Sequence, residues 1–255
     1  MKAMIFAAGL GTRLRPLTND RPKALVTVAG RTLLEIALSR LRAFGVRQVM
    51  VNTHHYAETI ADYLKANGDF GMSIELSREE ELLDTGGGLK KAAHFFLDSG
   101  DNSPEPFIVH NVDVISTIDL GRMMQFHIEN GALATLAVQD RATSRPLLFD
   151  GQGHLCGRRF VHPAKAERVQ DECVRPAVAA QPLAFSGVHI VSPQIFAKMT
   201  EEGAFSIIAA YLRLASQGEK IVAFRTDECY WRDLGRPQSI LEAAQDIAGG
   251  KYSIA

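Results

Sequence analysis

Three basic side chains lie close together in a glycine-containing stretch near the start of the chain. The stretch reads GLGTRLRPLT over residues 9–18, and the basic residues are Arg13, Arg15 and Lys23. Two glycines, two residues apart, let the backbone turn sharply and bring its N–H groups close to an anion. Arginine and lysine bind phosphate oxygens through charge-assisted hydrogen bonds. The stretch therefore predicts a site for a polyphosphate such as a nucleoside triphosphate.

Two well-known phosphate-binding motifs do not fit this stretch. A Walker A loop requires GxxxxGK[ST], a string that does not occur in the chain. The dinucleotide fingerprint GxGxxG requires a third glycine where this chain has Leu14, which argues against a nicotinamide-dependent dehydrogenase. Taken alone, the stretch is also compatible with a plain glycine turn that carries solvated basic residues.

The same stretch resembles the signature of the sugar-1-phosphate nucleotidyltransferases. The family pattern GxGTRLxPLT, followed by PK, matches residues 9–23. Shorter matches follow in the family's order: LLDTGGG (82–88) to its second glycine segment, NVD (111–113) to its metal motif, FSG (185–187) with SP (192–193) to its sugar-side strand, and YWRDLG (230–235) to its Trp-x-Asp motif. The resemblance is dense over residues 2–120 and patchier, though still in order, to residue 240.

The resemblance implies the activity and the cofactor of this family. A sugar-1-phosphate oxygen would attack the α-phosphorus of a nucleoside triphosphate and release pyrophosphate, with no covalent enzyme intermediate. Two anions approach each other in this reaction, which requires cations positioned around the developing charge. By resemblance, Asp113 and Asp233 would hold one Mg²⁺, an ion that takes one or two carboxylates together with substrate phosphate oxygens.

The resemblance also implies the remaining site residues. Lys23 would contact the α-phosphate or the attacking phosphate, and Arg13 would stabilise the pyrophosphate leaving group; these two are the predicted catalytic residues. Contacts to the nucleotide, mostly from backbone groups, are expected from Ala7, Ala8, Gly9, Gly11, Thr12, Arg13, Lys23, Gly86 and Asn111. Contacts to the sugar are expected from Asn111, Ser186 and Gly187.

Each of these assignments has a structural alternative. Asp113 follows an apolar run and would equally cap a turn or a helix. Asp233 would serve as an ordinary surface partner of Arg232. Trp231 is more often a core residue than a stacking platform, and the glycines at 86–88 would form a plain turn before a helix. The order of the matches favours the functional interpretation.

One position departs from the family's pattern. Val112 stands where the metal motif usually has glycine, and a β-branched side chain disfavours positive φ and close backbone approach. This substitution keeps a hypothesis from another class open, namely a non-catalytic nucleotide-sugar sensor that uses the same pocket. Retention of Arg13, Lys23 and both aspartates argues against the sensor.

The base and the sugar are less constrained than the reaction. The short length, the segment LLDTGGG and the segment Gly203-Ala204-Phe205 most resemble the single-domain N-acetylmuramate-1-phosphate uridylyltransferases. UTP is therefore the favoured nucleotide, and the product would be a cell wall precursor. Mannose-1-phosphate guanylyltransferases are similar enough to remain the alternative.

Strands that alternate with helices are predicted to position these residues. Strands are predicted over 2–8, 46–53, 72–76 and 107–110, and helices from about Thr32 and over 56–66, 88–97 and 120–129. This alternation is typical of an α/β fold, here a Rossmann-like, mostly parallel mixed sheet flanked by helices.

After Gly131 the pattern changes. Strands are predicted without intervening helices over 132–139, 146–150, 154–160 and 184–191, with a hairpin turn at 150–153, which indicates a small antiparallel flap. The stretch 161–182 carries no assignment, and helices return at about 205–216 and 236–248. We expect a single nucleotidyltransferase domain, 1–255, with a nucleotide-binding part over about 1–130, a sugar-side part over about 131–255 and no second activity.

Composition excludes several other classes. The chain has 255 residues, and 28 Lys and Arg against 29 Asp and Glu give a net charge of −1, which excludes a broadly basic nucleic-acid-binding surface. Three cysteines without a CxxC fit a reducing compartment rather than a disulfide framework or a zinc knuckle. The apolar run 3–8 is too short to span a membrane, so a cytoplasmic protein is predicted. His54 and His55 are discounted as a metal pair, since adjacent strand residues point to opposite faces.

Overall fold

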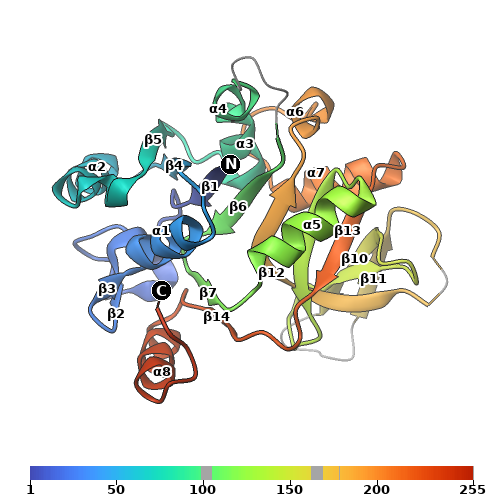
Figure 1. The fold of residues 1–255 in the computed structure, drawn as a ribbon. Coiled ribbons are helices and arrows are strands. Elements are labelled where there is room, and N and C mark those ends of the chain that lie inside the picture. Colours follow the sequence, from blue (N-terminus) through green and yellow to red (C-terminus); the bar gives the residue numbers. More distant parts are fainter. Residues whose placement is uncertain (99–104, 162–168, 178, 255) are drawn as a thin grey trace.

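A mixed sheet of ten strands runs through the part of the chain that the computed structural model describes, residues 1–98, 105–161, 169–177 and 179–254 (Figure 1). Its N-terminal half consists of parallel strands in the spatial order β5–β4–β1–β6. These strands are β1 (Lys2–Phe6), β4 (Gln48–Thr53), β5 (Ser73–Arg78) and β6 (Phe107–Asn111). The predicted α/β class, with a mostly parallel mixed sheet, is confirmed.

Strand β1 shows how the two faces of this sheet are covered. Its alternate residues point to opposite faces, as the pleat of a strand requires. Ala3 and Ile5 join a core with helices α1, α2, α5 and α8, whereas Met4 and Phe6 join a second core with α3, α4, α6 and α7. A strand buried on both faces reads as a continuous apolar run, which is why the sequence identified it.

The C-terminal half of the sheet is mostly antiparallel. Strand β12 (Gln181–Val191) lies antiparallel beside β6 and also pairs with β8 and β9. The flap continues outward from β9 through β10 to β11, and β13 lies parallel to β8. These strands are β8 (Ala134–Gln139), β9 (Leu147–Phe149), β10 (Leu155–Val161), β11 (Val169–Cys173) and β13 (Ile221–Arg225). The flap confirms the prediction, while β11 falls in the unassigned stretch 161–182, of which 162–168 and 178 lie outside the described residues.

The helices occupy both faces of the sheet (Figure 1). Thr32 caps α1 by accepting a hydrogen bond from Glu35 N at 3.0 Å, and Gly131 ends α5 in the left-handed conformation. None of the described helices is long and apolar enough to cross a membrane. The helices are α1 (Leu33–Ala43), α2 (Ala57–Ala66), α3 (Asp84–Lys91), α4 (Ala93–Leu97), α5 (Leu120–Asn130), α6 (Ile195–Lys198), α7 (Ile207–Ser216) and α8 (Pro237–Ala248).

One helix begins earlier than the sequence predicted. A helix over 88–97 was expected, but α3 begins at Asp84, and a break at Ala92 separates it from α4. The glycines at 86–88 therefore lie inside the helix, and the interpretation as a turn before the helix is wrong.

Two small sheets join segments that are distant in the sequence. Strand β7 (Val114–Ser116) pairs antiparallel with β14 (Trp231–Asp233), and β2 (Thr27–Val28) pairs with β3 (Arg31–Thr32). Short 3-10 helices cover Thr12–Leu14, Lys23–Leu25 and Gly68–Gly71. The pair β7–β14 brings the end of the chain back to the loop that follows β6.

Candidate functional site

The candidate site lies where the parallel strands change direction of succession. The chain passes from β1 to β4 on one side, while β6 lies on the other side of β1. The loops that leave the carboxyl ends of β1 and β6 therefore meet at a topological switch point, the usual ligand site of an open α/β sheet. Both of these loops carry residues that the sequence singled out.

The loop after β1 folds back on itself around Gly11. This glycine has a φ of 65°, and Thr18 Oγ1 donates to its carbonyl oxygen at 2.9 Å. A Cβ at this position would lie 3.0 Å from Lys23 Cβ and 3.0 Å from Thr18 Cγ2. A side chain is therefore excluded both by the backbone conformation and by the close approach of Lys23. Thr12 and Arg13, on the next turn, are exposed to solvent.

Lys23 reaches across to the loop that follows β6. Its Nζ forms an ion pair with Asp113 Oδ2, and the side-chain exposures are 14% for Lys23 and 10% for Asp113. These two residues lie 90 positions apart in the sequence. The structure thus brings a predicted phosphate-binding cation together with a predicted metal ligand.

Asp233 is brought to Asp113 by the pairing of β14 with β7. Asp233 lies opposite Val114 in the register, and Leu234 N donates to the Asp113 carbonyl oxygen at 2.7 Å. Asp233 Oδ1 accepts a hydrogen bond from Gly235 N at 2.6 Å. Asp233 therefore has a defined position beside the site, and the alternative of a surface partner for Arg232 is not what the structure shows, since Arg232 pairs with residues of α8.

Three predicted site residues converge on Gly235. A Cβ at Gly235 would lie 2.7 Å from Asp233 Oδ1, 3.0 Å from Arg13 Nη2 and 3.4 Å from Asp113 Oδ2. One point thus has two carboxylate oxygens and one guanidinium nitrogen within 3.4 Å, and only a residue without a side chain leaves that point free. Sequence reasoning included Gly235 in the matched motif but did not assign it a role.

The two carboxylates have the chemistry of a magnesium site. Mg²⁺ takes oxygen ligands and is commonly held by one or two carboxylates, with phosphate oxygens and water completing its coordination. Asp113 and Asp233 fit this requirement. Among the described residues, no cluster of three or more His, Cys, Asp or Glu side chains could hold a metal without such help.

Val112 is accommodated without strain. Its side chain is 3% exposed and belongs to the core on the α1 face, while its N–H donates to Phe6 O at 3.2 Å. The residue is not among those with positive φ. The valine therefore replaces the family's glycine without altering the backbone conformation that would carry Asp113.

The predicted sugar-side residues lie next to one another. A Cβ on Gly187, which has a φ of 74°, would lie 2.8 Å from Asn111 Nδ2. Ser186 is fully buried, and its Oγ has no hydrogen-bond partner among the described residues. Its carbonyl oxygen accepts a hydrogen bond from Trp231 Nε1 at 2.7 Å. Trp231 therefore links β14 to the sugar-side strand.

A buried polar network supports the nucleotide side. Asn52 Oδ1 accepts from Ala7 N at 2.7 Å, and Asn52 Nδ2 donates to Glu79 Oε1 at 2.7 Å. Glu79 Oε2 in turn accepts from Leu83 N at 3.0 Å. Sequence reasoning named the stretch 77–81 as a contact for the base but missed Asn52, because its role depends on β4 lying beside β1.

The first turn of α3 packs on the segment that precedes α7. Gly86 N donates to Phe205 O at 2.8 Å, so this N–H is already used within the protein. A Cβ on Gly86 would overlap the Phe205 ring and lie 2.8 Å from Phe205 O, and a Cβ on Gly88 would lie 2.7 Å from Glu79 Oε1. These glycines allow close packing, and any contact of Gly86 with a nucleotide would use another of its atoms.

The adjacent histidines have separate partners, as their discounting as a metal pair requires. His54 Nδ1 lies 2.8 Å from Glu79 O, whereas the His55 ring lies 4.1 Å from the Tyr56 ring, measured between centroids.

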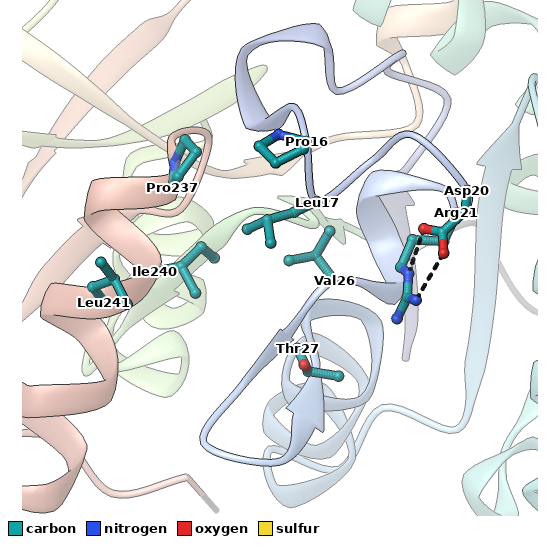
Figure 2. Close-up of a pocket in the computed structure, with 9 residues that line it drawn as sticks. All are labelled: Pro16, Leu17, Asp20, Arg21, Val26, Thr27, Pro237, Ile240 and Leu241. Carbon is teal, nitrogen blue, oxygen red and sulfur yellow. Dashed lines mark hydrogen bonds and ion pairs between the residues drawn. The ribbon is translucent and has the colours of Figure 1, made fainter.

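A pocket of about 540 Å³ lies on the other side of the phosphate-binding loop (Figure 2). Its walls are mainly apolar, with the ion pair of Asp20 and Arg21 at one edge. The lining residues are Pro16, Leu17, Asp20, Arg21, Val26, Thr27, Pro237, Ile240 and Leu241. None of them is a predicted site residue, so this pocket is distinct from the convergence at Gly235.

Comparison with known proteins extends over nearly the whole chain. The family described as nucleotidyl transferase matches residues 2–250. An N-acetylmuramate alpha-1-phosphate uridylyltransferase of Caulobacter vibrioides is 36% identical over 96% of this chain and 96% of its own length. A mannose-1-phosphate guanylyltransferase catalytic subunit beta of Drosophila pseudoobscura is 31% identical over 94% of this chain and 60% of its own length.

Solved structures share the fold. A UDP-glucose pyrophosphorylase of Acinetobacter baumanii superposes with a TM-score of 0.77 at 20% identity, covering 99% of this chain and 95% of the other. At this identity the similarity concerns the architecture of the chain.

Proposed function

This chain belongs to the nucleotidyl transferase family and is a sugar-1-phosphate nucleotidyltransferase, and we propose that it transfers a uridylyl group from UTP to N-acetylmuramate 1-phosphate in a Mg²⁺-dependent reaction. The products would be pyrophosphate and a UDP-sugar that serves as a cell wall precursor. The observation that carries the proposal is the convergence of Arg13, Asp113 and Asp233 around Gly235, with Lys23 paired to Asp113.

The cations of the phosphate-binding loop would neutralise the two reacting phosphates. Lys23 would hold the α-phosphate or the attacking phosphate, and this contact would replace its ion pair with Asp113. Gly11, Thr12 and Arg13 would bind the β- and γ-phosphates, with Arg13 stabilising the charge that develops on pyrophosphate as it leaves. Such pre-positioned charges can supply most of the rate enhancement of phosphoryl transfer.

Asp113 and Asp233 would hold Mg²⁺. The ion would supply positive charge that stabilises phosphate oxygens in the transition state. The two aspartates are well placed for this, since each is fixed by the backbone of a different strand, β7 on one side and β14 on the other. Mutual repulsion of the two carboxylates is offset by Lys23 and Arg13 until substrate and metal bind.

The two halves of the sheet would divide recognition between them. Ala7, Ala8, Gly9 and Gly86 would contact the nucleotide, with Asn52 and Glu79 fixing the loop after β1. Asn111, Ser186 and Gly187 would contact the sugar, where the burial of the Ser186 hydroxyl favours contacts from Asn111 and the Gly187 backbone. We propose that residues 1–255 act as one domain, with a nucleotide-binding part over about 1–130 and a sugar-side part over about 131–255.

A reducing compartment suits this enzyme. All three cysteines are free thiols, and burial raises the pKa of Cys156 to about 11, which makes its thiol unreactive. Together with its soluble-type composition, this supports action in the cytoplasm, on a nucleoside triphosphate and a sugar phosphate rather than on nucleic acid or lipid.

A substrate matrix tests the proposal. UTP, GTP, CTP, dTTP and ATP are each combined with N-acetylmuramate 1-phosphate, mannose 1-phosphate, glucose 1-phosphate and N-acetylglucosamine 1-phosphate, and pyrophosphate release is followed with Mg²⁺ or with EDTA. We expect the highest kcat/KM with UTP and N-acetylmuramate 1-phosphate, and no turnover with EDTA. Nucleotide binding without turnover of any pair would support the sensor hypothesis instead.

The second candidate is mannose-1-phosphate guanylyltransferase activity. It is favoured by the 31% identity with the insect guanylyltransferase over 94% of this chain. A preference for GTP with mannose 1-phosphate in the same matrix would replace the first proposal while leaving the assignment of the catalytic residues unchanged.

A further inference from the structure

Arg141 carries a cation to the edge of the site, although the family signature did not include it. Its guanidinium carbon lies 3.6 Å from the centre of the Trp231 ring, a cation–π geometry. Its Nη2 donates to Phe185 O at 2.8 Å. Its Nε is buried and has no hydrogen-bond partner among the described residues. The guanidinium is therefore held in place by an aromatic face and one carbonyl, with donors left over.

The geometry of β14 places this cation beside the two functional halves of the site. Trp231 and Asp233 are two residues apart on the strand, so their side chains share a face, about 7 Å apart along the strand. Arg232 points to the opposite face, where it pairs with Glu242 and Asp246 of α8. Since Trp231 Nε1 also donates to Ser186 O, Arg141 lies between the Asp233 carboxylate and the sugar-side strand.

The charge of Arg141 has no counter-ion in the described protein. Arg158, Arg159 and Arg213 each form an ion pair with a carboxylate, but no described carboxylate lies within ion-pair distance of Arg141. Burial lowers the pKa of Arg141, and the nearby charge of Asp233 opposes that shift. Holding a guanidinium partly buried and unpaired costs free energy, which an incoming anion would recover.

We propose that Arg141 binds an anionic group of the sugar-phosphate substrate. The proposal rests on the proposed function, because it requires a sugar phosphate at the Asn111–Gly187 side of the site. Two anions on such a substrate have the right chemistry: the 1-phosphate itself, and a carboxylate on the sugar, such as the lactyl group of N-acetylmuramate. Arginine forms charge-assisted, bidentate hydrogen bonds with either group.

Calorimetric titration tests this role directly. Wild type, Arg141→Gln, Arg141→Lys and the control Arg122→Gln, an exposed residue of α5, are each loaded with Mg²⁺ and the α,β-methylene analogue of UTP, then titrated with N-acetylmuramate 1-phosphate and N-acetylglucosamine 1-phosphate. We expect Arg141→Gln to weaken sugar-phosphate binding about ten- to hundredfold, the scale of a charged hydrogen bond. Arg141→Lys should recover part of the loss, and Arg122→Gln should bind as wild type does.

The two probes identify which anion Arg141 binds. A similar loss with both sugar phosphates assigns it to the 1-phosphate, and a loss confined to N-acetylmuramate 1-phosphate assigns it to the carboxylate. Binding of both probes within about twofold of wild type by an Arg141→Gln protein that melts normally would overturn the proposal. An equal loss of affinity for the UTP analogue would also overturn it, because the effect would then be general.

Failure of the proposed function has a different signature. If the wild-type protein turns over no nucleotide and sugar-phosphate pair, the proposed function is wrong whatever the variants do. If the wild-type protein is active and Arg141→Gln keeps its KM for the sugar phosphate, only the role of Arg141 is wrong.

Discussion

The ion pair between Lys23 and Asp113 has more to do with function than with stability. Taking two charges out of water costs free energy that their attraction only partly returns, so buried pairs are poor stabilisers. Both side chains here are mostly buried, and both belong to loops after strands rather than to a core. In the free protein each residue keeps the other charged and in place.

At this scale we expect Lys23→Met to reduce turnover more than it reduces stability. Loss of the ammonium removes a preorganised contact to phosphate, and kcat should fall by about two orders of magnitude or more. Kinetics and a thermal melt on the same preparation check this, with Lys65→Met, on exposed α2 surface, as the control. A melting temperature that collapses while the surviving folded fraction keeps its activity would contradict the assignment.

The two aspartates support a second prediction. Asp113→Ala and Asp233→Ala should each lower turnover by about two or more orders of magnitude, because each removes an oxygen ligand and a charge from the same point. Activity measured over a Mg²⁺ titration checks this, and Asp62→Ala, on α2, is a matched control. Near wild-type rates in either variant would show that the metal assignment is wrong.

Residues were predictable where a long local pattern carried them. Lys23, Arg13 and the two aspartates were found because GxGTRLxPLT, NVD and WRD can be matched one by one along the chain. Arg141 and the pair Asn52–Glu79 were not, because their partners are set by which strands lie side by side, a property that no single segment encodes.

At the scale of elements, α3 is a helix built from residues that disfavour helices. Three consecutive glycines lie in its first half, where each costs about 1 kcal/mol relative to alanine. The packing explains them, since a side chain at Gly86 or Gly88 would collide with Phe205 or Glu79. Local propensity therefore misplaced the start of the helix, and tertiary contacts decide it.

This packing predicts that Gly86→Ala is destabilising even though alanine is the better helix former. The added methyl would lie 2.8 Å from Phe205 O, so the backbone before α7 must move, at a cost of about 1–3 kcal/mol. Urea unfolding compared with Gly151→Ala, whose Cβ would meet nothing within 4 Å, checks this. Equal stability of the two variants would contradict the contact between α3 and residues 203–205.

Other elements were predictable in proportion to their length. The long helices and the buried strands β1, β4 and β6 follow from periodicity alone. The three-residue strands β7 and β14 were missed, because strands this short have no periodicity and exist only by pairing with each other.

At the scale of the whole molecule, three histidines lie in the interior. Burial lowers the pKa of His110 and of His127 to about 4 and that of His189 to about 3; in His110 the charge of Arg40 adds to the effect. His110 Nε2 and His189 Nε2 have no hydrogen-bond partner among the described residues. These rings are therefore neutral in the folded protein at physiological pH.

The free energy of unfolding should consequently fall as the pH drops. The unfolded chain takes up protons near pH 6.5 while the folded chain does not, so the stability is fully present above that pH and is lost toward pH 4, by at most about 1.4 kcal/mol per pH unit and histidine. Urea unfolding at pH 7.5, 6 and 5, about where carboxylates remain ionised, checks this.

A variant separates the contribution of one ring. His127→Gln can keep hydrogen bonds to Thr135 Oγ1 and Ser192 Oγ, and its stability should depend less on pH than that of the wild type. A stability that is constant between pH 7.5 and 5 in the wild type would contradict the neutral buried histidines.

Strand β12 runs without interruption from the flap into the main sheet. Its first residues pair with β9, its last with β6 and β8, and its register with β8 shifts between Phe185 and His189, around Gly187. Chimaeras that exchange flaps among relatives are thereby restricted in where they can be joined. A graft can take β9, β10, β11 and the start of β12, but it must end before Phe185, because one inserted or deleted residue beyond that junction would turn every later side chain of β12 to the wrong face. Specificity for the sugar can thus be transplanted only together with a seam that preserves the host's own bulge.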